Sequence, residues 1–471
     1  MRYCSTRGKV NNQSFEDVLF NNYTSIGGMF MPEFVPKISQ ETLQYWSNLS
    51  YVDLCKEISR IFIDDKEIPT FDLNTIITAA FTNVFDHEDI VPVIKVSDKI
   101  YVAEMWHGPS LAFKDLALSC VAQFMAFFNA KQSRHVTILV ATSGDTGSAA
   151  IESVRKFKNI DIICMFPRGA CSAIQELQMT TVIEDNVHVF SSEGTSDDMD
   201  VVLQSILKDS ALVRKYNLCT VNSANWARIM IQIVHYFHVY FQLCDNVGDK
   251  VHVIVPTGGM GNVTAGCIAY LMGLPIIITC ATNINDTAHR AITFGEYFPK
   301  EVSKTIAPAM DIQVPSNFER IIFLFAGVEV VTEFVCEFEK YGKANVPEVA
   351  RKKISSVLCS CSVTQNEIMY SMKKSWIEWN YLVDPHTATG IHVACTNKFQ
   401  SICGPVILST AHIDKFLETV ALLDIPHEPM KSIQSLKTKP TKYSELNKGE
   451  NWREILLKRI LNIQQNYTNS C

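Results

Sequence analysis

Six short runs of apolar and β-branched residues recur along the chain, separated by segments of helical length. They are VTILVA (Val136–Ala141), IDIICMF (160–166), NVHVF (186–190), VHVIVP (Val251–Pro256), PIIITCAT (275–282) and GPVILST (404–410). Because polar residues seldom alternate with the apolar ones, each run is typical of a strand buried on both faces. Such strands alternating with helices predict an α/β fold with a mostly parallel sheet.

The rest of the chain has a helical pattern. Residues 1–93 contain few β-branched runs and predict helical turns between polar loops, for example over Tyr51–Phe62. Residues 332–380 are helix-like and charged, and the tail after Glu428 predicts a loop followed by a last helix over 452–464. The sheet-forming part is therefore expected between a helical N-terminal region and a C-terminal extension.

The composition excludes several classes of protein. With 471 residues and 47% hydrophobic content, the chain can bury a large core and form two or three domains. The net charge of -7 gives no basic excess for nucleic acid or an anionic membrane. The start MRYCSTRGKVNNQ lacks the apolar segment of a secretory signal, and the longest apolar stretches are too short to span a bilayer. We therefore expect a cytoplasmic protein without nucleic-acid or membrane partners. A monomer and a homodimer are both compatible with this sequence.

The cysteines give no metal or disulfide signal. The chain has 15 of them, but they are scattered and no CxxC pair occurs, the nearest pair being Cys359 and Cys361. This spacing does not suit zinc, and we predict no metal site. The cysteines are interpreted as small buried hydrophobic residues of a reducing compartment.

A loop of small polar residues follows the first predicted strand. It consists of Thr142, Ser143, Gly144, Asp145 and Thr146, and a helical segment comes next. In an open parallel sheet, ligands bind beyond the carboxyl ends of the strands. Hydroxyl groups and free backbone N–H groups at the start of a helix suit a carboxylate or a phosphate. The alternative is an ordinary helix cap by Ser143 or Asp145, which explains one such residue better than five in a row.

Three glycines follow the predicted strand Val251–Pro256. Gly258, Gly259 and Gly261 precede another helix, where backbone N–H groups can converge on a phosphate. Thr264 replaces the last glycine of a GxGxxG motif, and no GKS or GKT follows, so a dinucleotide or a nucleoside triphosphate is disfavoured. The loop suits a single phosphate group, with a plain strand-to-helix turn as the alternative.

Lys114 lies inside the apolar run WHGPSLAFKDLALSC. An amine in apolar surroundings is more often uncharged and becomes a better nucleophile near neutral pH, as Schiff-base lysines do. The alternative is a lysine that extends to water beside Asp115.

Thr410 ends the last run and offers a hydroxyl to a heteroaromatic nitrogen, although such threonines commonly only finish a strand. His412 is interpreted as structural. An amine, a single-phosphate loop and a carboxylate loop together indicate pyridoxal phosphate chemistry on an amino acid.

Several motifs resemble those of the threonine synthase family. HGPSLAFKD resembles its lysine motif HGPTxAFKD, and further matches follow in order along most of the chain. They are YCSTRG, GGMFMPE, TSGDTGSAA, NSANWARI, VPTGGMGN and LSTAH. Within the family the resemblance is greatest to the animal threonine synthase-like 2 group, with IQELQMTT and NVHVF as supporting stretches. The resemblance implies a fold-type II pyridoxal-phosphate enzyme, similar to the tryptophan synthase β-subunit, with a two-lobed parallel-sheet core.

This family architecture gives a predicted division of the chain. The predicted units are a mainly helical N-terminal domain (1–93), a two-lobed catalytic core that binds pyridoxal phosphate (94–425, with its small lobe at about 110–210), and a C-terminal extension packing on the core (426–471). A cleft between the lobes is expected to exclude water from reactive intermediates when it closes.

The resemblance also implies a role for each matching position. Lys114 is expected to form the Schiff base with pyridoxal 5'-phosphate and later to carry protons. The cofactor phosphate is expected at Gly258, Gly259, Met260, Gly261 and Asn262, the pyridine nitrogen at Thr410, and the ring hydroxyl near Asp145. The substrate carboxylate is expected at Thr142, Ser143, Gly144 and Thr146, and the substrate phosphate at Asn222 and Arg228. A planar guanidinium can donate two hydrogen bonds to a phosphate, whereas Arg228 alone is equally a surface cation.

The implied reaction is a phospho-lyase reaction on a small phosphorylated amino acid. O-phosphohomoserine or O-phosphothreonine loses phosphate and yields 2-oxobutyrate and ammonia. This outcome is implied by the resemblance to the animal group. The alternative is threonine synthase, in which water adds to Cβ and threonine is released. A non-catalytic relative that only binds a partner is a third interpretation, disfavoured by the intact Lys114 and both loops.

Two positions depart from the family pattern. Gly259 stands where the phosphate loop usually has Asn, and Ser110 stands where the lysine motif usually has Thr. Glycine amides still donate hydrogen bonds, so cofactor binding is expected to remain. The missing side chain at Gly259 is expected to alter how the reaction intermediate is handled.

Overall fold

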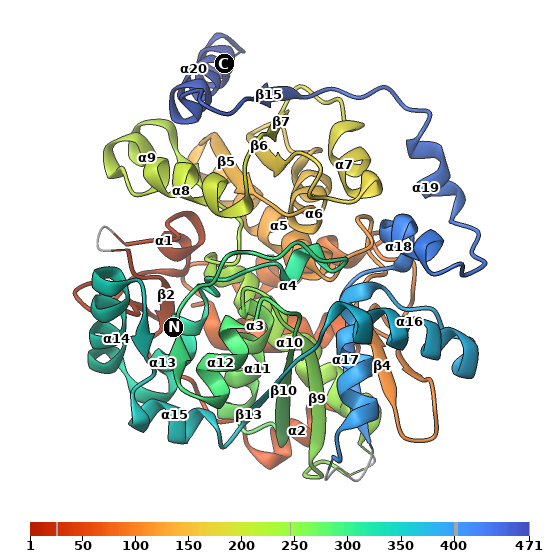
Figure 1. Cartoon of the computed structure of the whole chain (residues 1–471). Coiled ribbons are helices and arrows are strands. Elements are labelled where there is room, and N and C mark those ends of the chain that lie inside the picture. The colour runs from red at the N-terminus through yellow and green to blue at the C-terminus, as the bar shows by residue number, and fades with distance from the viewer. Residues whose placement is uncertain (25–26, 245, 400–403, 471) are drawn as a thin grey trace.

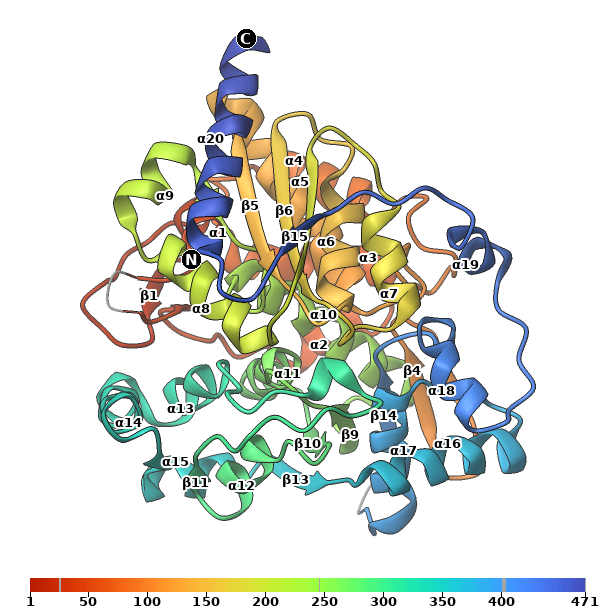
Figure 2. The same cartoon turned by 45° about the horizontal axis from the view of Figure 1, so that its top comes forward.

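Two sheets organise the chain into an upper and a lower lobe (Figures 1 and 2). The computed structural model describes residues 1–24, 27–244, 246–399 and 404–470. The lower sheet has the order β13 (Leu358–Ser362), β10 (Ile276–Thr282), β9 (Val251–Pro256), β14 (Pro405–Ser409), β4 (Tyr101–Glu104) and β3 (Val93–Lys95). The upper sheet has the order β15 (Ser444–Leu446), β7 (Val187–Ser192), β6 (Ile160–Pro167), β5 (Val136–Ala141) and β8 (Leu218–Cys219).

All six runs predicted as strands are strands, with ends that differ by at most two residues. Every neighbouring pair in both sheets is parallel except β3 with β4. The side chains of β5 and β9 are buried along their whole length, as the continuous apolar runs require. The predicted α/β fold with parallel sheets is therefore confirmed.

Helices cover both sheets. Those of the upper lobe are α5 (Lys114–Gln132), α6 (Asp145–Val154), α7 (Ala173–Thr180), α8 (Ser196–Leu207), α9 (Ser210–Tyr216) and α20 (Trp452–Ser470). Those of the lower lobe are α11 (Gly261–Leu271), α12 (Thr287–Thr293), α13 (Phe318–Ala326), α14 (Val328–Tyr341), α15 (Glu348–Ile354), α16 (Gln365–Trp379) and α17 (Pro385–Thr396). The 3-10 turn η1 (Pro308–Met310) precedes α13. The 3-10 turn η2 (Ile413–Phe416) and the helices α18 (Leu417–Leu422) and α19 (Lys431–Leu436) lie between β14 and β15.

Helix α10 (Trp226–Leu243) packs against helices of both lobes. Its sequence WARIMIQIVHYFHVYFQL is apolar around most of its circumference, and its side chains are buried from Trp226 to Tyr240. It packs against α5 of the upper lobe, α11 of the lower lobe and α3 (Tyr51–Phe62). A helix that is apolar on nearly all sides belongs in a core, and α10 gives the two lobes a shared one.

The N-terminal region forms the four helices α1 (Phe15–Phe20), α2 (Gln40–Trp46), α3 and α4 (Thr70–Phe81). Helix α3 has the predicted bounds, because Ser50 accepts a hydrogen bond from the Asp53 N–H and so caps its start. Its residues Leu54, Ile58 and Phe62, spaced at one turn, are buried. This region is not wholly helical, since it also contains the antiparallel pair β1 (Tyr3–Ser5) and β2 (Phe30–Pro32).

Two predictions of secondary structure were wrong in part. Residues 332–380 are not helical throughout, because they contain β12 (Ala344–Asn345), which pairs with β11 (Glu296–Tyr297), and the edge strand β13. The predicted loop after Glu428 contains α19 and β15, and β15 extends the upper sheet beside β7. These strands are two to five residues long and half exposed, so they show no continuous apolar run. The division into three domains stays a prediction.

The 13 described cysteines are all free, and Cys403 and Cys471 lie outside the described residues. No helix within the described ranges has the length and apolarity needed to cross a membrane.

Candidate active site

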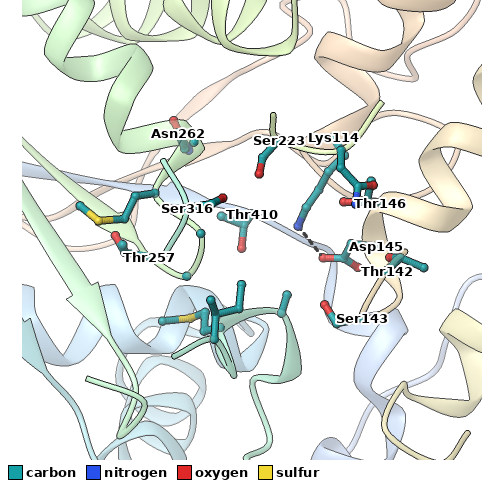
Figure 3. A pocket seen from close by; sticks show the side chains of 18 of the residues that line it. Lys114, Thr142, Ser143, Asp145, Thr146, Ser223, Thr257, Asn262, Ser316 and Thr410 are labelled. Carbon is teal, nitrogen blue, oxygen red and sulfur yellow. Dashed lines mark hydrogen bonds and ion pairs between the residues drawn. The ribbon is translucent and has the colours of Figure 1, made fainter. Parts of the chain in front are cut away.

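A cavity of about 220 Å³ opens between the two lobes, at the carboxyl ends of β5, β9 and β14. The hydroxyl loop (residues 142–146), the glycine turn (residues 258–261), Lys114 and Thr410 meet there. All the predicted site residues line this cavity except Gly144. Figure 3 shows the hydroxyl groups of Thr410, Ser223 and Ser143 around the Lys114 side chain.

Lys114 is the first residue of α5 and reaches into the cavity. The preceding Phe113 donates its N–H to the Thr410 carbonyl at 2.9 Å, which fixes the start of α5 against the end of β14. The Lys114 side chain is 11% exposed, and its Nζ lies 2.8 Å from Asp145 Oδ2 (Figure 3). Its partner is therefore Asp145, whereas Asp115 accepts a hydrogen bond from the Ser110 N–H. The alternative of a lysine that extends to water beside Asp115 is wrong.

Burial of Lys114 favours its neutral form. Burial lowers the pKa of Lys114 below its ordinary value, Asp145 opposes this shift, and the positive charges of Lys415 and Arg228 add to it. Burial alone would raise the pKa of Asp145, but Lys114 and Lys415 outweigh burial and hold that pKa well below its usual range. The site thus combines a carboxylate whose ionised form is stabilised with an amine whose charged form is destabilised by burial.

The hydroxyl loop is organised by its own side chains. Thr142 Oγ1 accepts hydrogen bonds from the N–H groups of Gly144, at 2.9 Å, and Gly147, at 3.0 Å. Helix α6 has no side-chain cap by Ser143 or Asp145, so the simple cap does not explain these residues. Gly144 has φ +125°, and a Cβ there would lie 2.5 Å from Gln175 Cδ, so only glycine fits. Gly144 therefore shapes the loop while facing away from the cavity.

The glycine turn begins α11 and is tightly packed on one side. A Cβ on Gly258 would lie 2.8 Å from the Ala309 carbonyl oxygen, whereas one on Gly259 would meet no atom closer than 3.8 Å. Met260 has φ +62°, a left-handed conformation uncommon for a residue with a side chain. Strain of this kind concentrates at ligand sites, and the turn leads the first N–H groups of α11 towards the cavity.

Hydrogen-bonding atoms near the cavity are left unused by the described residues. They are Asn222 Oδ1, Arg228 Nε, Gln232 Oε1 and Asn262 Nδ2, all buried. Buried polar atoms normally have a partner, so this cluster is typical of a site built for a polar ligand.

Arg228 is a buried cation and not a surface one. It lies in the first turn of α10, where its Nη1 donates to the Val221 carbonyl at 2.9 Å. Burial lowers the pKa of Arg228 to about 10, so it stays charged at neutral pH. No described carboxylate forms an ion pair with it, which leaves the guanidinium for an anion in the cavity.

Two residues that the sequence analysis missed tie the glycine turn to the NSANWAR segment. Asn317 Nδ2 donates to Gly259 O at 3.0 Å and to Ser223 Oγ at 3.1 Å. Arg320 is fully buried and donates to Asn317 Oδ1 at 2.6 Å and to the Ser223 carbonyl at 2.9 Å. We call Asn317 and Arg320 the clamp. The sequence signal for these two residues is that they are polar and lie among the apolar residues of the segment NFERIIF.

A second missed residue group lies in the segment DPHTATG, at the start of α17. His386 lines the cavity, contacts Asp384 Oδ1 through Nδ1 at 2.7 Å, and accepts the Ala309 N–H at Nε2 at 3.1 Å. It thereby holds the loop that faces the glycine turn. His412 does not line the cavity and packs edge-on against Trp106, in agreement with its interpretation as structural.

The protein has the features of the class of fold-type II pyridoxal-phosphate enzymes. These are two sheets, a lysine in the cleft between them and a glycine turn at the start of a helix. Residues 82–333 match the family model "Pyridoxal-phosphate dependent enzyme", and residues 2–81 match "Threonine synthase N terminus". The chain belongs to the threonine synthase family of these enzymes. The predictions of this fold type and of pyridoxal phosphate as the cofactor are confirmed.

The similarity to curated and solved relatives extends over nearly the whole chain. Threonine synthase-like 2 of Xenopus laevis is 44% identical over 99% of this chain and 99% of its own, and that of Homo sapiens is 40% identical over 99% and 98%. A pyridoxal-phosphate-bound threonine synthase from Brucella melitensis is 33% identical, with a TM-score of 0.90 over 98% of this chain and 99% of its own.

Proposed function

We propose that the chain eliminates phosphate from O-phosphohomoserine, O-phosphothreonine or both, giving 2-oxobutyrate, ammonia and inorganic phosphate. One observation carries the proposal: Lys114, the glycine turn and the buried Arg228 line a single cavity. An amine for the cofactor aldehyde, amides for one phosphate and a guanidinium for a further anion match a phosphorylated amino-acid substrate. The resemblance to the animal threonine synthase-like 2 group favours the lyase outcome.

The residues of the cavity fit the cofactor. Gly259 leaves room for a phosphate beside the N–H groups that begin α11, and Asn262 Nδ2 has no partner among the described residues. Lys114 is proposed to bond to the aldehyde, and Thr410 to face the pyridine nitrogen. The remaining proposed contacts are the cofactor phosphate with Gly258, Gly259, Met260, Gly261 and Asn262, and the ring hydroxyl with Asp145.

The substrate is proposed to lie between the hydroxyl loop and Arg228. The hydroxyl groups of Thr142, Ser143 and Thr146 and the N–H groups at the start of α6 would hold its carboxylate, as helix starts hold anions. The Arg228 guanidinium and the Asn222 side chain would bind its phosphate.

When bound, pyridoxal phosphate supplies a conjugated ring that takes up the electron pair released at the substrate Cα. Lys114, released when the substrate amine replaces it at the cofactor aldehyde, would remove the Cα proton, and its lowered pKa favours the neutral amine that this step needs. With O-phosphohomoserine, Lys114 would also take a proton from Cβ as the Cγ–O bond breaks, and Cγ would then gain a proton, whereas O-phosphothreonine needs only cleavage of its Cβ–O bond. Arg228 stabilises the departing phosphate, and one water is consumed when 2-oxobutyrate and ammonia form.

Threonine synthesis is the second candidate. It is favoured by the solved threonine synthases, of which the yeast structure has a TM-score of 0.89 over 99% of this chain. The test is to incubate the full-length, cofactor-loaded protein with each phosphorylated amino acid and to separate threonine from 2-oxobutyrate by mass spectrometry. Stoichiometric 2-oxobutyrate and phosphate support the lyase, threonine as main product overturns it, and release of no phosphate rejects both.

Gly259→Asn is expected to raise the yield of threonine relative to 2-oxobutyrate. A Cβ at Gly259 has ordinary contacts, 3.8 Å from Ile312 Cδ1 and 3.9 Å from Ser223 Oγ, so the variant should fold and bind cofactor. An amide side chain there would face the cavity and order water near the reacting carbons. We expect the product ratio to change by a factor of about 2 or more, a difference of ~0.4 kcal/mol or more in barrier height. An unchanged ratio, as in the matched surface variant Gly342→Asn, would show that this position does not direct the outcome.

Asn317→Ala is expected to weaken cofactor binding by about 10-fold or more, a loss of ~1.4 kcal/mol or more. The substitution removes the side-chain donor to Gly259 O, which keeps only the Asn317 N–H at 3.3 Å, and it removes one acceptor of the buried Arg320 guanidinium. A hydrogen bond to a charged group contributes about 1.5–3 kcal/mol, so the melting temperature should also fall. Cofactor titration followed by fluorescence measures the first effect, and calorimetry the second. Asn48→Ala, at an exposed position, is the control. Unaltered cofactor affinity would contradict the role of the clamp.

A further inference from the structure

A second lysine lies next to the cavity without lining it. Lys415 belongs to η2, directly after β14, and its side chain is 0% exposed. Its Nζ lies 2.6 Å from the Ser110 carbonyl oxygen, 3.2 Å from Asp145 Oδ1 and 3.5 Å from Ser148 Oγ. Burying an ammonium group is costly, so such a lysine persists where oxygen atoms surround it and its charge serves a purpose.

Lys415 and Lys114 bind opposite oxygens of the same carboxylate. Lys114 Nζ contacts Asp145 Oδ2 at 2.8 Å, and Lys415 Nζ contacts Oδ1 at 3.2 Å. Gln175 Nε2 also donates to Oδ1, at 2.9 Å. The single negative charge of Asp145 is therefore shared by two lysines. Of the two, only Lys114 reaches the cavity.

We infer that Lys415 is the lasting counter-ion of Asp145 and keeps this carboxylate paired whenever Lys114 loses its charge. The inference rests on the proposed function only in assigning Lys114 as the amine that reacts. If Lys114 were the sole partner, its deprotonation would leave a buried, unpaired carboxylate, and that cost would hold Lys114 in its charged form. With Lys415 in place, Asp145 keeps an ion pair, and Lys415 also repels a proton on Lys114. Lys415 is thus a positioning residue that acts through Asp145.

The charged and titratable groups that face this pair come from several elements. Those around Lys114 are Asp145, Lys415 and Arg228, and those around Lys415 are Asp115, Asp145 and Cys171, with His386 acting on Asp145. Because these charges lie close together, each of them contributes to the midpoint observed for Lys114, and only a comparison of variants isolates the part due to Lys415.

The test measures the titration of Lys114 in the full-length chain freed of cofactor. Trace acetic anhydride labels neutral amines, and peptide mass spectrometry reports the labelling of Lys114 from neutral to alkaline pH. In Lys415→Met we expect the Lys114 midpoint to rise by about one pH unit or more, because a nearby positive charge is lost while Asp145 remains. Lys415→Arg should restore the wild-type midpoint.

Control variants separate the charge from a structural contribution. Gln175→Leu removes the neutral donor on the same oxygen and should move the midpoint by less than half of the Lys415→Met shift. If Lys415→Met does not fold, as judged by circular dichroism, Lys415→Gln keeps a donor to Ser110 O and serves instead. An unchanged Lys114 midpoint in a folded variant without the charge overturns the inference. The labelling needs neither cofactor nor substrate, so its result is independent of the product assay that tests the proposed function.

Discussion

Lys114→Ala is expected to give a colourless protein that has lost activity by about 10³-fold or more. Lys114 is the one lysine among the described cavity-lining residues, and its amine is proposed both to bond to the cofactor and to move the Cα proton. Lys415 cannot replace it, because its Nζ is held by Ser110 O and Asp145 and its side chain is fully buried. Absorbance spectra before and after borohydride, together with the product assay, measure the two effects.

The control for this variant lies on the same helix. Lys131 is an exposed residue in the last turn of α5, so Lys131→Ala should leave the visible band and the activity unchanged. The wild-type band should disappear on reduction with borohydride. A colourless wild type after cofactor loading would instead favour a non-catalytic binding protein, and a Lys114→Ala variant within ten-fold of wild type would remove this lysine from the mechanism.

The strands and the loops after them could be predicted because their signals are local. A strand buried on both faces must be apolar throughout, as β5 and β9 are, and the carboxyl ends of parallel strands meet at one edge. The sequence therefore indicated that Lys114, the hydroxyl loop and the glycine turn serve one site. Edge strands such as β13 and β15 carry no such signal, because one side faces solvent and their stability comes from backbone pairing.

The missed residues act through contacts far apart in the sequence. Lys415 contacts Asp145, which lies 270 positions earlier in the sequence, and Asn317 contacts Ser223, which lies 94 positions earlier. Neither lies in a motif whose spacing implies a partner, and a lysine after a strand or an asparagine before a helix is ordinary. Only the fold shows that these polar side chains are buried. Arg228 was recognised by resemblance, but its burial and its lack of a described carboxylate partner are structural findings.

Arg228→Met is expected to lower kcat/KM for the phosphorylated substrate by about 10²-fold or more, because a charge-assisted pair with a phosphate is lost. The fold should tolerate the change, since removing a buried charge that lacks a carboxylate partner relieves a desolvation penalty. We expect most of the loss in KM if Arg228 binds the phosphate equally throughout, and in kcat if the contact strengthens as phosphate leaves. Steady-state kinetics and competitive inhibition by inorganic phosphate distinguish these cases.

Arg228→Lys separates charge from geometry. A lysine keeps the positive charge but cannot form the two parallel hydrogen bonds of a guanidinium, so its kcat/KM should fall between those of the wild type and Arg228→Met. Arg155→Met, outside the cavity and paired with Glu152 and Glu184, is the matched control and should retain wild-type kinetics. Should Arg228→Met bind inorganic phosphate and turn over substrate like the wild type, the leaving group must lie elsewhere in the cavity. The hydroxyl loop would then be the remaining anion site, and the orientation of the substrate would have to be reversed.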